Sequence, residues 1–198
     1  MIKHLIYFAP VLLIILCSAG CEDENYVPKP PTYLRLEIPK ANYETFTDDC
    51  PYTFEISSLY DVQASPEAEG LTCHKRIDLG PLNGMAYIRY WDLNGEKPLS
   101  FFINGANDEI DRHQLKADNI DDWQIKRPDE RVFGTAFELQ GDVATPFQFY
   151  LTDSTTKFLY CEVLFNSTPN YDSLKPTLDY FRKDLDHLLE TFEWKNNQ

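Results

Sequence analysis

The strongest hydrophobic pattern lies near the C-terminus, where apolar residues recur every three or four positions. They are Leu174, Leu178, Phe181, Leu185, Leu188, Leu189 and Phe192. This spacing places them on one face of a helix of about five turns. Ser173 is a good N-cap, and Pro176 then falls at the third helical position, where its missing N–H is no loss. The pattern predicts a long amphipathic helix that packs on other elements.

A second helical pattern follows Pro98 in the middle of the chain. Its apolar-face residues are Leu99, Phe102, Ile103, Ala106, Ile110, His113 and Ala117. Their steps of mostly three and four predict a helix over residues 99–117. Asn104 and Gly105 interrupt the pattern, so a break at that point is an alternative.

Between the two helical patterns the periodicity changes to that of strands. Apolar and polar residues alternate over 146–152, which predicts a strand with one buried face. Residues 157–165 are apolar on both faces, as in a central strand, and 153–156 form a turn. Together with 131–140, these segments predict a three-stranded antiparallel meander.

Shorter strand patterns occur upstream, at residues 35–38, 52–57 and 85–91. With the meander and the two helices they predict an α+β fold, in which an antiparallel sheet packs against the long C-terminal helix and the middle helix. Strands followed by a C-terminal amphipathic helix resemble a Mog1/PsbP-type sandwich. We expect a single globular domain over residues 35–198.

The first 20 residues have the order of a secretory signal: a short basic start, the apolar run Leu5–Leu16, and small residues up to Gly20. The run is shorter than the roughly 18–20 apolar residues that span a bilayer. The small residues end on Cys21, which resembles a bacterial lipobox and predicts lipidation of Cys21. Cleavage near residue 20 to give a product without lipid is the alternative.

Residues 21–34 follow as an acidic and then proline-rich segment without an apolar period. They predict an extended tether between the lipid and the domain. The acidic residues Glu22–Glu24 directly after the lipid site fit either a sorting signal for the cell surface or a solvated linker.

The net charge of the chain bears on which classes of molecule it can bind. The chain of 198 residues carries 18 Lys and Arg against 32 Asp and Glu, a net charge of −14. Removing residues 1–20 takes away one lysine and leaves 178 residues with a charge of −15. An acidic chain of this kind is unsuited to binding nucleic acid, which requires a basic surface.

Cysteine use agrees with export. Of the five cysteines, Cys17 leaves with the signal and Cys21 takes lipid. The remaining three allow one disulfide in an oxidising compartment. Cys161 lies in an apolar run, where a buried free thiol is expected. The preferred pair is therefore Cys50 and Cys73.

The sequence lacks the motifs that identify common enzymes: no phosphate-binding loop, no H-E-x-x-H and no G-x-S-x-G. We therefore expect no catalytic residue, no metal site and no cofactor. His113 and Lys116 lie one helical turn apart with Asp118 close by, so these three residues are the candidates for a binding cleft. His187 follows Asp184 and Asp186 and is expected on a solvated face.

Several segments together resemble one family, the gliding-motility lipoprotein GldD of the Bacteroidetes. The matching stretches are 26–30, 50–55, 116–118, 146–155, 164–166, 169–174 and 192–194. Two departures stand out: Pro31–Thr32 where the family has a glycine, and Lys157 where it has a histidine. Cysteines at positions like Cys50 and Cys73 recur in the family, whereas Cys161 does not.

The resemblance implies a cell-envelope lipoprotein required for gliding, anchored through Cys21, with the outer membrane as the expected site. It implies a non-catalytic assembly or scaffold role beside other envelope proteins of gliding and type IX secretion. The alternative is a lipid-anchored enzyme or small-ligand-binding domain that uses a cleft near His113, Lys116 and Asp118.

Ser154 and Ser173 each follow an aspartate in a pattern that resembles the O-glycosylation sites of exported Bacteroidetes proteins. A structural role explains both residues equally well. Asp153 and Ser154 are good turn formers, and Ser173 is the expected N-cap.

Overall fold

The computed structural model describes residues 39–65, 73–167 and 171–195. Within these ranges the strands are β1 (Tyr43–Phe46), β2 (Tyr52–Ser57), β3 (Asp61–Ala64), β4 (Lys75–Asp78), β5 (Gly84–Asp92), β6 (Ala117–Arg127), β7 (Val132–Gly141), β8 (Phe147–Thr152), β9 (Lys157–Phe165) and β10 (Glu193–Trp194). The helices are the short η1 (Gly80–Leu82), α2 (Leu99–His113) and α3 (Tyr171–Thr191).

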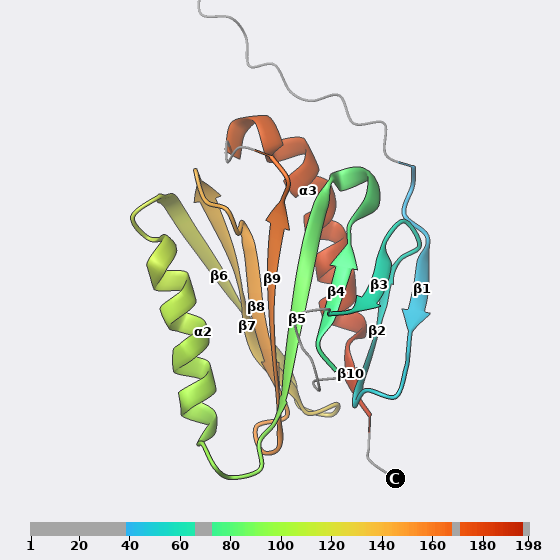
Figure 1. Cartoon of the computed structure of the whole chain (residues 1–198), viewed down its shortest axis with the longest axis vertical. Helices are drawn as coiled ribbons and strands as arrows, with labels where there is room; N and C mark the ends of the chain where they lie inside the picture. The colour runs from blue at the N-terminus through green and yellow to red at the C-terminus, as the bar shows by residue number, and fades with distance from the viewer. Residues whose placement is uncertain (1–38, 66–72, 168–170, 196–198) are drawn as a thin grey trace, which may run out of the picture. The chain divides into compact units, whose positions relative to one another are not determined.

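The strands form two sheets (Figure 1). The large sheet has seven strands in the order β3-β4-β5-β9-β8-β7-β6, and the small sheet has the order β1-β2-β10. Every pairing within the described ranges is antiparallel. The predicted α+β class and the meander of β7, β8 and β9 are confirmed, and β9 is the central strand of the large sheet.

One face of the large sheet is closed by α3 and the small sheet, and we call it the closed face. Alternate residues of β9, Leu159 and Cys161, point into this core because successive side chains of a strand face opposite ways. The helix contributes apolar residues at helical spacing, among them Leu178, Phe181 and Leu185, which are all at least 95 % buried. The predicted amphipathic face of α3 is thus the face that meets the sheet.

The opposite face of the large sheet is covered in part by α2, and we call it the open face. Phe158 and Tyr160 of β9 lie in a small apolar cluster with Ala106 of α2. Only Ala106 and Ile110 of α2 are fully buried. This face therefore has a much smaller apolar core than the closed face.

Both helices differ at one end from the prediction. Helix α2 begins after Pro98 and runs through Asn104 and Gly105 without a break, but it ends at His113. Ala117 instead begins β6, so it does not share the helix face. The chain leaves the helix through the turn that precedes this strand.

Helix α3 includes Tyr171, three residues before Leu174, the predicted first helical position. Ser173 therefore lies inside the helix and is not its N-cap. Pro176 is six residues into α3 when counted from Tyr171, not at the third position. Asp172 lies in the first turn, where a negative charge favours the helix dipole. The strand expected at 35–38 lies outside the described residues.

Strand β8 is buried on both faces, although its alternating sequence predicted one. Gln148 is 1 % exposed, and its polar groups are satisfied inside the protein. Its side-chain oxygen accepts a hydrogen bond from the Tyr160 hydroxyl, and its nitrogen donates to Thr145 Oγ1 at 2.9 Å. A polar residue in an alternating pattern can therefore be buried when partners lie within reach.

The first described strand is fixed to α3 by polar contacts. Asp184 is 5 % exposed and accepts hydrogen bonds from the hydroxyls of Tyr43 at 2.8 Å and Tyr60 at 2.5 Å. The Tyr180 hydroxyl donates to the carbonyl of Pro39 at 3.0 Å. These contacts join the start of the described chain to the middle of α3.

Candidate functional site

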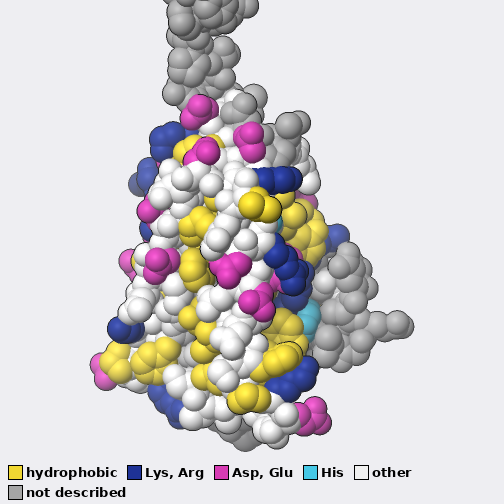
Figure 2. Space-filling view, turned by 90° about the vertical axis from the view of Figure 1, so that its left-hand side faces the viewer, with side chains coloured by type: hydrophobic (Ala, Val, Ile, Leu, Met, Phe, Trp, Pro, Cys, Tyr) yellow, Lys and Arg dark blue, Asp and Glu magenta, His cyan; other side chains and the backbone are white. Residues whose placement is uncertain are grey.

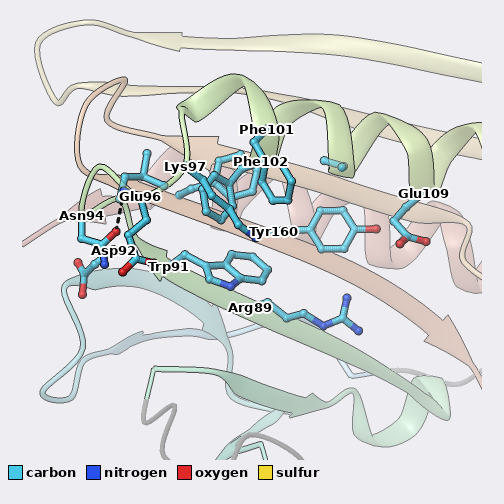
Figure 3. A pocket seen from close by; sticks show the side chains of 14 residues that line it. Arg89, Trp91, Asp92, Asn94, Glu96, Lys97, Phe101, Phe102, Glu109 and Tyr160 are labelled. Atoms are coloured by element: carbon cyan, nitrogen blue, oxygen red, sulfur yellow. Dashed lines mark hydrogen bonds between the residues drawn. The ribbon is translucent and has the colours of Figure 1, made fainter.

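A cleft of about 500 Å³ lies on the open face, between α2 and the strands β5 and β9 (Figure 3). Its walls are mainly aromatic. Trp91 comes from β5, Phe158 and Tyr160 from β9, and Phe101 and Phe102 from the first turn of α2. This volume lies within the range of about 300–1,000 Å³ of small-ligand pockets.

The cleft exists because α2 carries its smallest side chains where it crosses this part of the sheet. Gly105 and Ala106 line the cleft from the helix side. A Cβ atom added at Gly105 would have no atom within 4 Å, so the space in front of it is open. The Phe101 side chain is 51 % exposed at the rim. Apolar side chains thus reach the surface among charged ones on the side that carries α2 (Figure 2).

Polar side chains flank the aromatic walls at two places (Figure 3). Arg89 and Glu109 lie toward one end of the cleft, on β5 and α2. The Arg89 Nη2 atom is 2.5 Å from Glu162 Oε1, and the Glu109 Oε2 atom is 2.8 Å from Arg112 Nη1. Both charges therefore already have a partner of opposite sign.

The end of β5 and the loop between β5 and α2 supply the polar groups at the other end: Asp92 from the strand, and Asn94, Glu96 and Lys97 from the loop (Figure 3). Asp92 accepts a hydrogen bond from the Tyr90 hydroxyl. Asn94 Oδ1 accepts a hydrogen bond from the Glu96 amide at 3.2 Å. The Lys97 ammonium lies 4.1 Å from the centre of the Phe101 ring, in a cation–π contact.

The charged side chains of the cleft are three carboxylates, one lysine and one arginine. Its described lining includes no serine, cysteine or histidine. Burial raises the pKa of Tyr160, with the nearby Glu162 carboxylate adding to the effect, so the hydroxyl stays protonated and donates to Gln148. The arrangement offers aromatic faces with hydrogen-bond donors and acceptors at both ends.

The three residues proposed from sequence for a binding cleft, His113, Lys116 and Asp118, do not line this cleft. His113 Nε2 lies 2.9 Å from Thr145 Oγ1. Lys116 and Asp118 are exposed, in the turn after α2 and at the start of β6. Neither this cleft nor the small apolar cavity beneath α3 includes any of the three, and a binding role for them stays a prediction.

The other two histidines of the described chain make internal contacts. His187 Nε2 is 2.7 Å from Glu55 Oε2, and its ring stacks on Tyr43 at 3.7 Å between centroids. It is therefore a packing residue rather than one of a solvated face. His74 is 7 % exposed and meets the edge of Trp91. Burial lowers its pKa, and the positive Arg89 adds to this effect.

Asp153 organises the turn between β8 and β9. One of its oxygens, Oδ1, accepts hydrogen bonds from the amides of Thr155, Thr156 and Lys157, and Oδ2 accepts one from the Thr156 hydroxyl. Burial opposes ionisation, but these donors outweigh it and lower the pKa of Asp153 to about 2. Ser154 is exposed at the tip with φ 69°, whereas Ser173 lies in the first turn of α3. Glycosylation of either serine stays a prediction.

Cys50 and Cys73 form a disulfide in the structure, with Cα atoms 5.3 Å apart. It connects the chain before β2 with the chain before β4. Cys161 is free and buried, and burial raises the pKa of its thiol, so it is an unreactive core residue. Cys21, the predicted lipid site, lies outside the described residues.

The described ranges contain neither a candidate metal site nor a helix suited to span a membrane. Their histidine, cysteine, aspartate and glutamate side chains form no group of three or more that could hold a metal ion. None of the helices in these ranges is both long and apolar enough to cross a membrane.

Comparison with protein families shows to which family the chain belongs. The model of the family described as "Gliding motility lipoprotein GldD" matches residues 23–194. The chain belongs to the GldD family. Because GldD proteins are described as lipoproteins of gliding motility, membership implies association with a membrane of the cell envelope. The family resemblance found in the sequence is thereby confirmed.

Other comparisons add little to this assignment. The solution structure of cyanobacterial PsbP (CyanoP) from Synechocystis sp. PCC 6803 is similar with a TM-score of 0.45 and 10 % identity. The match covers 83 % of this GldD-family chain and 99 % of the cyanobacterial one. The score is too low to support an argument about function. A comparison with curated proteins gave no match.

The cleft was not predicted from the sequence, since its residues come from β5, β9, α2 and a loop. One signal was available. The adjacent aromatics Phe101 and Phe102 cannot both face the core of one helix, so one of them had to reach the surface. The exposed residue is Phe101.

Proposed function

We propose that this GldD-family protein is a lipid-anchored, non-catalytic component of the gliding machinery, with a role in assembly beside envelope proteins of type IX secretion. The observation that carries the proposal is the match of the GldD family over residues 23–194. The described cleft, which is lined by aromatic and hydrogen-bonding side chains, supports a binding role for the domain.

The proposed anchor is a lipid on Cys21, with residues 22–34 as the tether that sets the reach of the domain. Two or three acyl chains bind a membrane far more firmly than one, because each buried CH₂ contributes roughly 0.8 kcal/mol. A Cys21→Ala variant is expected to lose lipid labelling and to accumulate as unprocessed precursor. Unchanged processing would rule out the lipid site.

The role in gliding is tested in the host cell. We expect deletion of the gene to stop single-cell gliding, measured by time-lapse microscopy, and to reduce the amount of adhesin at the cell surface. Complementation with the wild-type gene should restore both, and complementation with Cys21→Ala should restore neither. Normal gliding and normal adhesin export in the deletion strain would refute the proposal.

The outer membrane is the proposed location, on either its periplasmic or its external side. Protease treatment of intact cells distinguishes the two sides. Degradation of the protein in intact cells would place it on the surface, whereas protection until the outer membrane is permeabilised would place it in the periplasm.

A further inference from the structure

We propose that the cleft between α2, β5 and β9 binds a pyranose unit of a neutral oligosaccharide. The proposal is independent of the role in gliding, and it rests on three features of the cleft: its aromatic faces, the mixture of its polar groups, and the small number of free main-chain groups beside it.

The aromatic faces suit the apolar side of a sugar ring. One face of a pyranose presents C–H groups, which pack against the electron-rich face of an aromatic ring. Trp91 lies along the cleft in Figure 3, with Phe101 and Phe102 across from it on α2. The Trp91 ring is 5.8 Å from that of Phe102 and 6.0 Å from that of Phe158, so these rings hold one another in place. The site is therefore largely formed before a ligand arrives.

The polar groups suit hydroxyls better than a charge. Two cations, Arg89 and Lys97, and three carboxylates, Asp92, Glu96 and Glu109, line the same cleft. Arg89 and Glu109 already have partners of opposite charge, and a charged ligand would have to compete with them. A sugar hydroxyl both donates and accepts, so it can use the remaining lone pairs of a carboxylate and the remaining N–H groups of a guanidinium.

The strands beside the cleft disfavour an extended peptide. Peptides commonly bind by adding a strand to a free sheet edge. Strand β9 is paired with β5 and β8, and β5 is paired with β9 along its length but with β4 only over 85–88. On the edge that β4 leaves beyond Ile88, the Tyr90 amide donates to His74 Nδ1 at 3.5 Å and the Asp92 carbonyl accepts from the Asn94 amide at 3.1 Å, so an added strand would find few free main-chain groups. The main-chain groups of α2 are used within the helix. The cleft therefore offers side chains to a ligand, as sugar-binding sites do.

Gly105 allows a test that keeps the fold. A larger side chain there projects into open space, because an added Cβ would meet nothing within 4 Å. Leucine is also a better helix former than glycine. Gly105→Leu should therefore fill the cleft without destabilising α2. Asn107→Leu places the same side chain on the same helix at an exposed position that does not line the cleft, and it is the matched control.

The experiment uses the full-length lipidated protein in a detergent without a sugar head group. Chitotetraose, cellotetraose and mannotetraose are titrated and followed by saturation-transfer NMR and calorimetry. We expect the wild-type protein to bind at least one of them with a Kd of about 0.1–1 mM, as for a small open site. Binding of chitotetraose alone would point to a cell-wall glycan, and binding of the other two to an extracellular polysaccharide.

Gly105→Leu and Phe101→Ala should each weaken binding about tenfold or more, whereas Asn107→Leu should bind like the wild type. Circular dichroism checks that all variants are folded. The proposal is overturned if the wild-type protein binds none of the three sugars, if Gly105→Leu binds as well as the wild type, or if the cleft takes a peptide from a library and no saccharide.

Discussion

The two faces of the large sheet are built for different tasks. On the closed face, α3 buries seven residues, and the five apolar ones pack with the small sheet into the main core. On the open face, α2 buries two residues and leaves an aromatic cleft beside its first half. Because free energy of folding follows the apolar area that is buried, we infer that the closed face provides most of the stability.

The difference also separates the effects of mutation. Substitutions on the closed face should lower stability, whereas substitutions in the cleft should change binding and leave stability nearly unchanged. Variants on the two faces, compared with a variant elsewhere in the sheet, test this separation.

Leu185→Ala should cause the largest loss of stability among these variants. The residue is 2 % exposed in the centre of α3, and truncation removes buried area and leaves a cavity. We expect the free energy of unfolding to fall by about 4 kcal/mol in urea denaturation. Leu99→Ala at the partly buried start of α2 is the control and should cost about 1 kcal/mol. Equal losses would mean that the two faces contribute alike.

Loss of the disulfide should cause the second-largest loss of stability, because the disulfide lies on the side of the closed face. Cys50 and Cys73 are 23 residues apart, and a bridge over such a loop stabilises a protein by about 3 kcal/mol. The double variant Cys50→Ser/Cys73→Ser is expected to lose about that amount relative to the oxidised wild type. Reduction of the wild type should have a similar effect, and reduction of the double variant none.

Asp153→Asn tests a turn at the end of the sheet, away from both helices. The folded carboxylate has a pKa of about 2 against an ordinary value of 3.8. Its stabilising effect is therefore complete above pH 3.8 and is lost as the pH falls toward 2. After solvent screening, we expect the variant to be less stable by about 1 kcal/mol at pH 7. The difference from the wild type should be much smaller at pH 2, where about half of the Asp153 carboxyl groups are protonated, as measured by urea denaturation at both pH values.

Gly105→Ala should change the free energy of unfolding least, and it should raise it where the other variants lower it. Alanine is the better helix former by about 1 kcal/mol, and the added methyl group meets no atom. We expect a gain of about 0.5 kcal/mol, seen as a higher midpoint in urea. A loss of stability would show that the open face is more tightly packed than the structure indicates.

The parts of the fold that the sequence predicted are those with a strong period and one dominant environment. The face of α3 and the central position of β9 follow directly from their apolar patterns. Strand β6 was missed, since it lies at the edge of the sheet and carries the exposed Asp121 and Asp122. Edge strands often carry charged side chains of this kind. These residues interrupt the alternation of apolar and polar positions by which a strand is recognised in a sequence.

The errors at the ends of elements have local causes. His113 continues the apolar spacing of α2 but contacts Thr145 at the point where the helix ends. Ser173 satisfies the rules for an N-cap, yet Tyr171 and Asp172 are already helical. The cleft could not be predicted because Trp91 and Phe158 become neighbours only through the pairing of β5 with β9, which no local pattern contains.

The contacts of β1 with α3 determine which elements bear a mechanical force that is applied to the N-terminal part of the chain. Such a force enters the described fold at Pro39 and passes to Tyr43, which is fixed to Asp184 and stacked on His187. Strand β1 has four residues and pairs only with β2 in the described sheets, so without these side-chain contacts it could peel away one hydrogen bond at a time. The buried carboxylate of Asp184 thus transfers tension from an edge strand to the longest helix of the described fold.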